Sequence, residues 1–240
     1  MPTAIEKLRV ELGKYTLEEL QAQFTPAELN EINNTLIDIR CAERVASFDS
    51  GPLYWLTSGL TRTENPQYEA QGLPFRAPLP KKTYLLPLFD AFLAVSAEHP
   101  LFIPKSRTML TSLSSQAYGT WAAQWHGMQT LVQTLNEDRC ILLMSYVHNY
   151  YDLQPDWLKA RHPLKRKSAF SVEWVNGGEV CCIPSGSEKS RGYHSTYYIQ
   201  DESAWIVDGE ECLAAVKPSG AKIICISSAA PGWFAEECER

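Results

Sequence analysis

"LFIPKSRTMLTS", residues 101–112, is the stretch that decides the fold class of this chain. It opens with an apolar run typical of a buried strand, passes through a short polar turn, and reaches Thr111 and Ser112, which can begin a helix. A strand, a turn and a helix in this order have the layout of a phosphate-binding loop, because the amides of the turn and of the helix N-terminus attract anions. The stretch contains no glycine, although glycine is the residue that allows a backbone to approach a ligand closely.

Strand and helix signals alternate through the C-terminal part of the chain. We expect a helical stretch after residue 104, running to about Leu135. The later strand signals are a buried strand in 140–146, a hairpin in 168–186 with Asn176-Gly177 at its turn, and strands in 195–203 and 221–229. Apolar strands separated by helices predict an α/β fold with a mostly parallel sheet that helices cover on both faces.

The N-terminal third predicts helices and then a connector. "TLEEL" (16–20) and "TPAE" (25–28) each place a threonine three residues before a glutamate, as helix starts do, and a long helix should run from the second to about Val45. Residues 50–82 are rich in proline, glycine, threonine and aromatic residues, which predicts an extended, ordered connector. We therefore expect a helical extension with its connector in residues 1–82 and a core in residues 83–240.

The composition of the 240 residues is that of an ordinary globular protein, with 45% hydrophobic and 21% charged residues. No apolar run approaches the roughly 20 residues that cross a bilayer, and the N-terminus lacks the apolar segment and cleavage site of a secretory signal. The seven cysteines are scattered along the chain, which fits a reducing compartment. No two of them form a CxxC pair, which argues against a structural zinc site. We expect a cytoplasmic protein without a membrane span.

Charge is distributed unevenly along the chain. The net charge of −6 argues against a protein that coats nucleic acid through its overall field. A local basic strip, "LKARHPLKRKS" at 158–168, could meet phosphates or form a solvated connector, and the sequence leaves both open.

Polar residues follow three of the expected strands, at the sheet edge where α/β proteins bind ligands. A nucleoside triphosphatase needs a cation on the phosphates, a hydroxyl and a carboxylate for hydrated Mg²⁺, and a carboxylate that accepts a proton from the attacking water. Lys105 supplies the cation and Ser112 the hydroxyl, while Asp201 supplies the metal carboxylate and Glu202 the base. Ser227-Ser228 ends the third strand. Each group alone also fits a solvated side chain or a polar strand end, but their order along the chain favours a shared site.

Three segments together resemble a known family: "KSRTMLTS" (105–112), "IPSGSEKSRGYHSTYYIQDESAW" (183–205) and "VKPSGAKIICISSAAPGWF" (216–234). They are similar to the ATPase motor of the large terminase subunit of tailed bacteriophages, which packages DNA into procapsids. The resemblance covers about residues 84–234, with a weaker likeness in "GPLYWLTSGLTRTENP" (51–66). It implies a P-loop NTPase fold of the ASCE type with a helical N-terminal extension.

The resemblance also implies roles for single residues. In the variant loop of this family the lysine stands at the start, which matches Lys105, and Asp201 and Glu202 match the metal-binding aspartate and the catalytic glutamate of the Walker B motif. The implied Mg²⁺ ligands are Ser112 and Asp201. The implied ATP-binding loop consists of Lys105, Ser106, Arg107, Thr108, Met109, Leu110, Thr111 and Ser112, and the motif that couples hydrolysis to movement consists of Ser227, Ser228 and Ala229.

Two arginines are candidates for a cation that stabilises the transition state. Arg107, inside the loop, could reach the γ-phosphate of its own subunit, or it could solvate the helix start or pair with a carboxylate. Arg191, ten residues before Asp201, matches a family position implied to reach a neighbour's nucleotide. Its alternative is a structural pair with an acidic residue.

Two departures from the family pattern affect the expected activity. Family loops of this type commonly keep a glycine two residues before the helix-opening serine or threonine, where this chain has Leu110, so loss of hydrolysis is one alternative. The chain also ends soon after the coupling motif, so the lid and the nuclease of the family are expected to be absent and no DNA cutting is expected. A fragment of a longer protein and a shortened relative both fit this ending.

These features lead to two hypotheses of different classes. The first is an ATP-hydrolysing motor domain in the host cell cytoplasm that moves double-stranded DNA into a procapsid. It would use ATP and Mg²⁺, work as a homo-oligomeric ring, and have the portal protein and the small terminase subunit as partners. The second is a catalytically silent module of the same fold that docks the small terminase subunit or the portal. A helicase-like ATPase is disfavoured, because the chain contains no further helicase domain.

Overall fold

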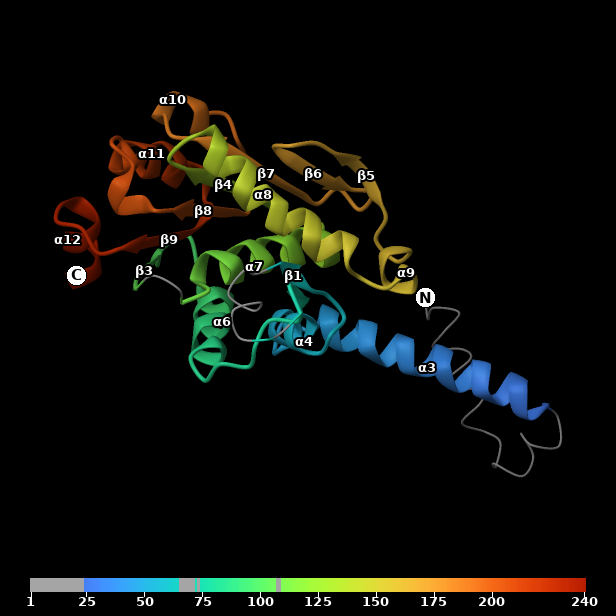
Figure 1. Ribbon diagram of the computed structural model, residues 1–240. Helices are drawn as coiled ribbons and strands as arrows, with labels where there is room; N and C mark the ends of the chain where they lie inside the picture. The colour runs from blue at the N-terminus through green and yellow to red at the C-terminus, as the bar shows by residue number, and fades with distance from the viewer. Residues whose placement is uncertain (1–23, 65–71, 73, 107–108) are drawn as a thin grey trace. The chain divides into compact units, whose positions relative to one another are not determined.

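The computed structural model describes residues 24–64, 72, 74–106 and 109–240 (Figure 1). The chain divides into two compact units, residues 1–43 and 44–240. The sequence suggested a division after residue 82, whereas the range of the second unit includes all of the expected connector, residues 50–82. The helix start expected at 16–20 lies outside the described residues.

Helix α3, Pro26–Ala46, is the helix expected after "TPAE". The amide and the hydroxyl of Thr25 both donate to a carboxylate oxygen of Glu28 at 2.8 Å, and the amide of Glu28 donates to Thr25 Oγ1 at 3.3 Å. This reciprocal pairing satisfies amides that a helix start leaves without partners, and Pro26 has no N–H to satisfy. The structure confirms the predicted helix and its end near Val45.

The prediction of an extended connector is wrong in its first part, because residues Gly51–Thr57 form helix α4. Pro52 lies in the first turn of this helix, where proline is tolerated, and Trp55 and Leu56 are buried. The elements that follow are two short antiparallel strands, β1 (Thr63–Glu64) and β2 (Arg76–Ala77), and helix α6 (Leu85–Ala94). The glycine and proline that suggested a loop therefore mark a helix start.

A seven-stranded sheet forms the centre of the second unit, with the strand order β3-β9-β8-β4-β7-β6-β5. The first five strands of this order run parallel, and β6 and β5 join antiparallel at one edge. The bounds are β3 Leu101–Lys105, β4 Gln129–Thr134, β5 Leu164–Lys167, β6 Ser171–Trp174, β7 Glu179–Pro184, β8 Tyr197–Asp201 and β9 Lys222–Ser228. The structure confirms the α/β class, the mostly parallel sheet, the hairpin β6–β7 and the strands expected around β3, β8 and β9.

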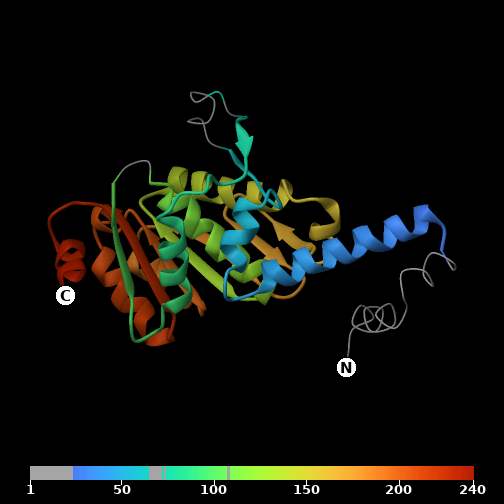
Figure 2. The same cartoon turned by 90° about the horizontal axis from the view of Figure 1, so that it is seen from below.

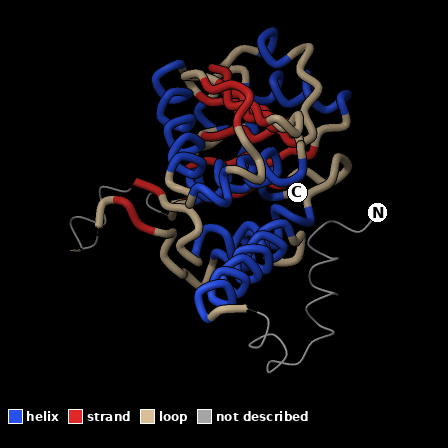
Figure 3. Tube along the Cα trace, turned by 90° about the vertical axis from the view of Figure 1, so that its right-hand side faces the viewer, coloured by secondary structure: helices blue, strands red, loops and turns tan. Residues whose placement is uncertain are grey.

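Helices cover both faces of the sheet (Figure 3). On one face helix α7, Thr111–His126, lies so close to β4 and β8 that a Cβ added at Gly119 would stand 2.8 Å from the Thr130 methyl and 3.3 Å from Ile199. Leu131 and Tyr198, the strand neighbours of these two residues, point to the opposite face, because successive side chains of a strand alternate. The remaining helices are α8 Glu137–Asp152, α9 Asp156–Lys159, α10 Ser187–Ser190, α11 Gly209–Val216 and α12 Trp233–Glu239, with short 3₁₀ turns at Ser203–Trp205 and Lys217–Ser219.

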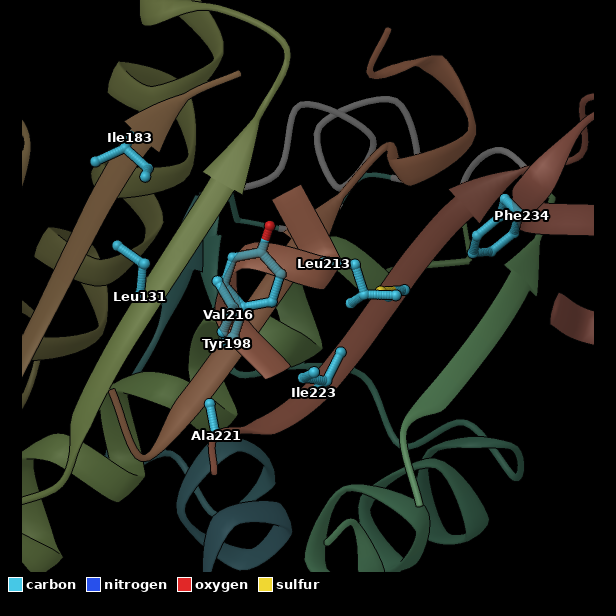
Figure 4. Packing of buried hydrophobic residues seen from close by; sticks show 9 residues of the cluster. Leu131, Ile183, Tyr198, Leu213, Val216, Ala221, Ile223 and Phe234 are labelled. Atoms are coloured by element: carbon cyan, nitrogen blue, oxygen red, sulfur yellow. The ribbon is translucent and has the colours of Figure 1, made fainter. Parts of the chain in front are cut away.

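The core on the second face holds the strands that carry the candidate site. Figure 4 shows its side chains converging from β4, β7, β8, β9, α11 and α12. Burial of one large aliphatic or aromatic side chain stabilises a fold by about 1.5–3 kcal/mol, so this cluster fixes β8 and β9 relative to each other. Its members are Leu131, Ile183, Tyr198, Leu213, Val216, Ala221, Ile223, Cys225 and Phe234.

Two elements between β3 and the hairpin were predicted wrongly. The helix expected to reach Leu135 ends at His126, where Gly127 adopts φ 66° as its cap, and the next residues form β4, a central strand. The strand expected in 140–146 is part of α8, whose start is capped by Asn136 accepting from the Arg139 amide at 3.0 Å. In α8 the buried residues Cys140, Leu143, Met144 and Val147 follow helical spacing, whereas Ile141 and Leu142 are exposed.

Candidate active site

The carboxyl ends of three neighbouring parallel strands, β3, β9 and β8, lie side by side at one edge of the sheet. Strand β9 lies between β3 and β8, and Figure 2 shows β3 beside β9. In the register of these strands Lys105 pairs with Ser228, and Asp201 pairs with Ile226. The parallel sheet therefore brings together side chains that lie about a hundred residues apart in the sequence.

Lys105 and Glu202 form an ion pair at the centre of this edge. The Lys105 Nζ donates to Glu202 Oε1 at 2.8 Å, and the two side chains are 10% and 21% exposed. Burial of the Glu202 carboxyl acts to raise its pKa, but the hydrogen bond and charge of Lys105 and the hydrogen bonds from Ser228 outweigh burial and lower the pKa. Glu202 is therefore a carboxylate at neutral pH.

Ser112 and Asp201 form the second contact of the site. The Ser112 hydroxyl, in the first turn of α7, donates to Asp201 Oδ1 at 2.7 Å. Asp201 is 5% exposed, and burial raises the pKa of its carboxyl to about 6, although the hydrogen bond from Ser112 acts to lower it. A hydroxyl and a carboxylate oxygen in contact are ligands of the kind that Mg²⁺ prefers.

Ser227 and Ser228 connect the end of β9 to the residues around Glu202. Ser228 donates to Glu202 Oε2 from its hydroxyl at 3.2 Å and from its amide at 3.5 Å. Ser227 Oγ accepts from the amide of Ala204 at 3.1 Å, while Ala229 follows the strand and is exposed. The two serines hold the turn after Glu202 against β9.

Leu110 and Glu202 are, within the described part of the chain, the only non-glycine residues with positive φ, at 56° and 59°. This left-handed conformation costs a residue with a side chain about 1–2 kcal/mol, and such strain gathers at functional sites. Leu110 precedes the first residue of α7, so it adopts the backbone conformation that glycine would supply. The loop therefore reaches α7 through a left-handed residue, although this residue is not glycine.

The rest of the predicted loop is described in part. Ser106 is exposed, and Met109 is half-buried with its carbonyl 3.5 Å from Thr111 Oγ1. Thr111 is the first residue of α7 and is 3% exposed. Arg107 and Thr108 lie outside the described residues.

Arg191 follows α10 and forms an ion pair with Glu188 at 2.8 Å. The two side chains are 64% and 78% exposed, and exposed pairs of this kind contribute little to stability. The side chain is accordingly available to another partner at small cost.

The basic strip lies in and before β5. This strand and β3 are the two outermost strands of the sheet, on opposite sides. Its strand residues pair with carboxylates: Lys165 with Glu173 at 2.7 Å, Arg166 with Glu179 at 3.1 Å and Lys167 with Asp152 at 2.5 Å. These pairs agree with the solvated alternative for the strip and offset most of its charge.

Two residues of the site were missed in the sequence. Arg139, near the start of α8, lies close enough to Asp201 to oppose, with Ser112 and Lys105, the rise in pKa that burial causes. Trp205 donates from Nε1 to Ser228 Oγ at 2.9 Å. No sequence pattern indicated either Arg139 or Trp205.

Solved structures with a similar fold come from phage packaging proteins. The ATPase domain of the large terminase of Thermus phage P74-26 matches with a TM-score of 0.50 and 14% identity, over 73% of each chain. The large terminase of bacteriophage HK97 matches with a TM-score of 0.55 and 10% identity, over 78% of this chain and 37% of that one. The chain has the fold of a large-terminase ATPase domain.

This terminase fold agrees with the resemblance carried by the three sequence segments. No family model and no curated protein sequence matches the chain, so the likeness at 10–14% identity concerns the fold. In the described part of this terminase-like fold, no helix is both long and apolar enough to cross a membrane, and no three His, Cys, Asp or Glu residues gather as a metal cage.

Proposed function

We propose that the chain is a Mg²⁺-dependent ATPase domain of a viral DNA-packaging motor, with Lys105, Ser112, Asp201 and Glu202 in its active site. The observation that carries the proposal is the meeting of these side chains at one sheet edge, through an ion pair of 2.8 Å and a hydrogen bond of 2.7 Å. A cation, a hydroxyl and two carboxylates are the groups that phosphoryl transfer to water requires.

Lys105 is the proposed phosphate-binding cation. It stands at the end of β3, before the N-terminus of α7, whose free amides add a positive field for an anion. A bound triphosphate would compete with Glu202 for the Lys105 ammonium. Binding of the nucleotide would therefore release the Glu202 carboxylate from its ion pair.

Ser112 and Asp201 are the proposed ligands of Mg²⁺. This ion commonly takes one or two carboxylates from the protein and completes its shell with phosphates and water, which fits a site with one hydroxyl and one carboxylate. Bound there, it would offset the charge that develops on the phosphates. Because Asp201 binds the ion as a carboxylate and its pKa is about 6, metal binding should weaken below about pH 6.

Glu202 is the proposed general base. Its lowered pKa keeps it deprotonated at neutral pH, and Ser228 holds one of its oxygens at 3.2 Å. Once Lys105 has moved to the phosphates, the other oxygen can accept a proton from the attacking water. Movement of Glu202 would reach Ser227, Ser228 and Ala229, which we propose as the link between hydrolysis and translocation.

Arg191 is the proposed arginine supplied to a neighbouring subunit in a homo-oligomeric ring. Its exposure and its weak ion pair with Glu188 support this role. Arg107, inside the loop, remains a candidate within its own subunit. Double-stranded DNA, the portal protein and the small terminase subunit are the partners that the motor proposal requires.

A catalytically silent docking module is the second candidate. The observation that favours it is Leu110, because a strained leucine stands where the family loop commonly has glycine. A silent module would keep the fold and bind its protein partner without ATP turnover.

Phosphate release with Mg²⁺ separates these candidates. We expect turnover by the wild-type chain and a loss of nucleotide affinity of at least about tenfold in Lys105→Ala, since a charged contact is worth about 1.5–3 kcal/mol. Lys217→Ala, which removes an exposed lysine outside the site, is the matched control. Wild-type chains that bind nucleotide without hydrolysis would favour the silent module, and equal losses in both variants would place the phosphates elsewhere.

A further inference from the structure

Trp205 is a residue of the site whose position is poorly explained by core packing. It ends the short turn after Glu202, and it is 55% exposed. Its indole Nε1–H nevertheless donates to Ser228 Oγ at 2.9 Å, and its backbone amide donates to the Glu202 carbonyl at 2.9 Å. Hydrogen bonds to the site, more than burial, define where this side chain lies.

The bond from Trp205 determines where the hydroxyl hydrogen of Ser228 points. A serine hydroxyl has one hydrogen to donate and two lone pairs that accept. Because one lone pair accepts from the indole, the hydrogen is directed to the other neighbour, Glu202 Oε2 at 3.2 Å. Trp205, Ser228 and Glu202 therefore form a relay in which each bond fixes the direction of the next.

Glu202 depends on this relay for its orientation. Its Oε1 accepts from Lys105, the contact that a nucleotide would remove, while Oε2 accepts from Ser228. Its backbone has φ 59°, a conformation that glutamate adopts at a cost and that surrounding bonds must hold. After Lys105 leaves, Ser228 still donates to the carboxylate from its hydroxyl.

We propose that Trp205 is a positioning residue for Glu202, acting through Ser228 to hold the carboxylate toward the attacking water. The inference rests on the proposed ATPase function of the site. The indole hydrogen-bonds to Ser228, whereas the groups proposed to hold the phosphates and the metal are Lys105, Ser112 and Asp201. Its effect should therefore fall on the rate of the chemical step and leave nucleotide affinity unchanged.

Hydrogen exchange at the indole tests the relay without any need for turnover. In a ¹⁵N-labelled chain, Ser228→Ala should speed exchange of the Trp205 indole proton by about fivefold or more, since it removes the acceptor of a bond worth a few RT. The indole of Trp233, whose Nε1 has no partner among the described residues, should exchange at the same rate in both proteins. An unchanged rate at Trp205 would overturn the relay.

A double-mutant cycle tests the effect on catalysis. Trp205→Phe should lower kcat roughly 3- to 10-fold, the effect of one neutral hydrogen bond, with KM unchanged, whereas Trp233→Phe should keep the wild-type kcat. In a Ser228→Ala background, Trp205→Phe should change kcat by less than about twofold, because the relay is already broken. A wild-type kcat in Trp205→Phe, or effects that multiply, would overturn the proposal. A wild type without turnover would contradict the proposed function instead, while the exchange rates would still decide the relay.

Discussion

Replacing Glu202 with glutamine should tighten nucleotide binding while it stops hydrolysis. A nucleotide that takes Lys105 must break the ion pair with Glu202, which is 2.8 Å long and largely buried. Glutamine keeps the shape and leaves Lys105 a neutral acceptor, but it cannot accept a proton from water. The substitution therefore removes the base and weakens the competitor for Lys105 in one step.

The size of the gain follows from the two kinds of hydrogen bond. A bond to a charged partner contributes about 1.5–3 kcal/mol and a neutral one about 0.5–1.5 kcal/mol, so the pair weakens by about 1–1.5 kcal/mol. At 1.4 kcal/mol per factor of ten, affinity for a non-hydrolysable ATP analogue should rise about 5- to 10-fold. Removing a negative charge from the neighbourhood of the phosphates acts in the same direction.

Calorimetric titration with the analogue and Mg²⁺ measures the gain, and phosphate release measures the loss of turnover. Glu236→Gln is the matched control, because it removes the same charge from an exposed position in α12. Affinity equal to or below that of the wild type in Glu202→Gln would refute the competition for Lys105. Turnover at the wild-type rate would refute the assignment of the base.

Three further predictions concern ionisation, strain and assembly. The pKa of Asp201 in the folded state is raised to about 6, so ionisation of this carboxyl destabilises the fold as pH rises from about 4 to about 6. Asp201→Asn should therefore increase the free energy of unfolding at pH 7 by up to about 3 kcal/mol, seen as a higher Tm, and should lose this advantage near pH 4. In urea unfolding, Leu110→Gly should be more stable than Leu110→Ala by roughly 0.5–1 kcal/mol, because glycine adopts the positive φ of this position without strain. At the control position Leu142 in α8, the alanine variant should be more stable than the glycine variant. A more stable alanine variant at both positions would contradict the backbone strain at Leu110. Mixed Arg191→Ala and Glu202→Gln chains, each inactive, should regain part of the turnover if the arginine acts across subunits, and a mixture as inactive as either variant would place its role within its own chain.

The strand ends could be predicted from the sequence because each combines a short apolar run with polar residues at a fixed place. Lys105, Asp201 and Ser228 therefore appeared at one edge before any contact was known, and the sheet brings them together. The contacts between them, such as Ser112 to Asp201, follow from the parallel order of strands and could only be expected in outline.

The errors have physical causes in particular segments. Strand β4, "QTLVQT", is mostly buried although four of its six residues are polar, because helices cover both faces of the sheet. The Thr130 hydroxyl donates to the Gly119 carbonyl and the Gln133 side-chain amide donates to the Pro184 carbonyl. In α8 the short apolar run Cys140–Met144 hid the helical spacing of the residues that are buried. Leu110 has a left-handed backbone conformation, which leucine rarely adopts, so the sequence did not indicate it. The hydrogen bond from Trp205 to Ser228 corresponds to no sequence pattern.

A structure of the chain with Mg²⁺ and a non-hydrolysable ATP analogue tests the central claim most directly. The account predicts that Lys105 leaves Glu202 for the phosphates, that the metal is bound by Ser112 Oγ and the Asp201 carboxylate, and that Glu202 stays hydrogen-bonded to Ser228. A nucleotide bound elsewhere, or one bound at this edge with the Lys105–Glu202 pair intact, would contradict it.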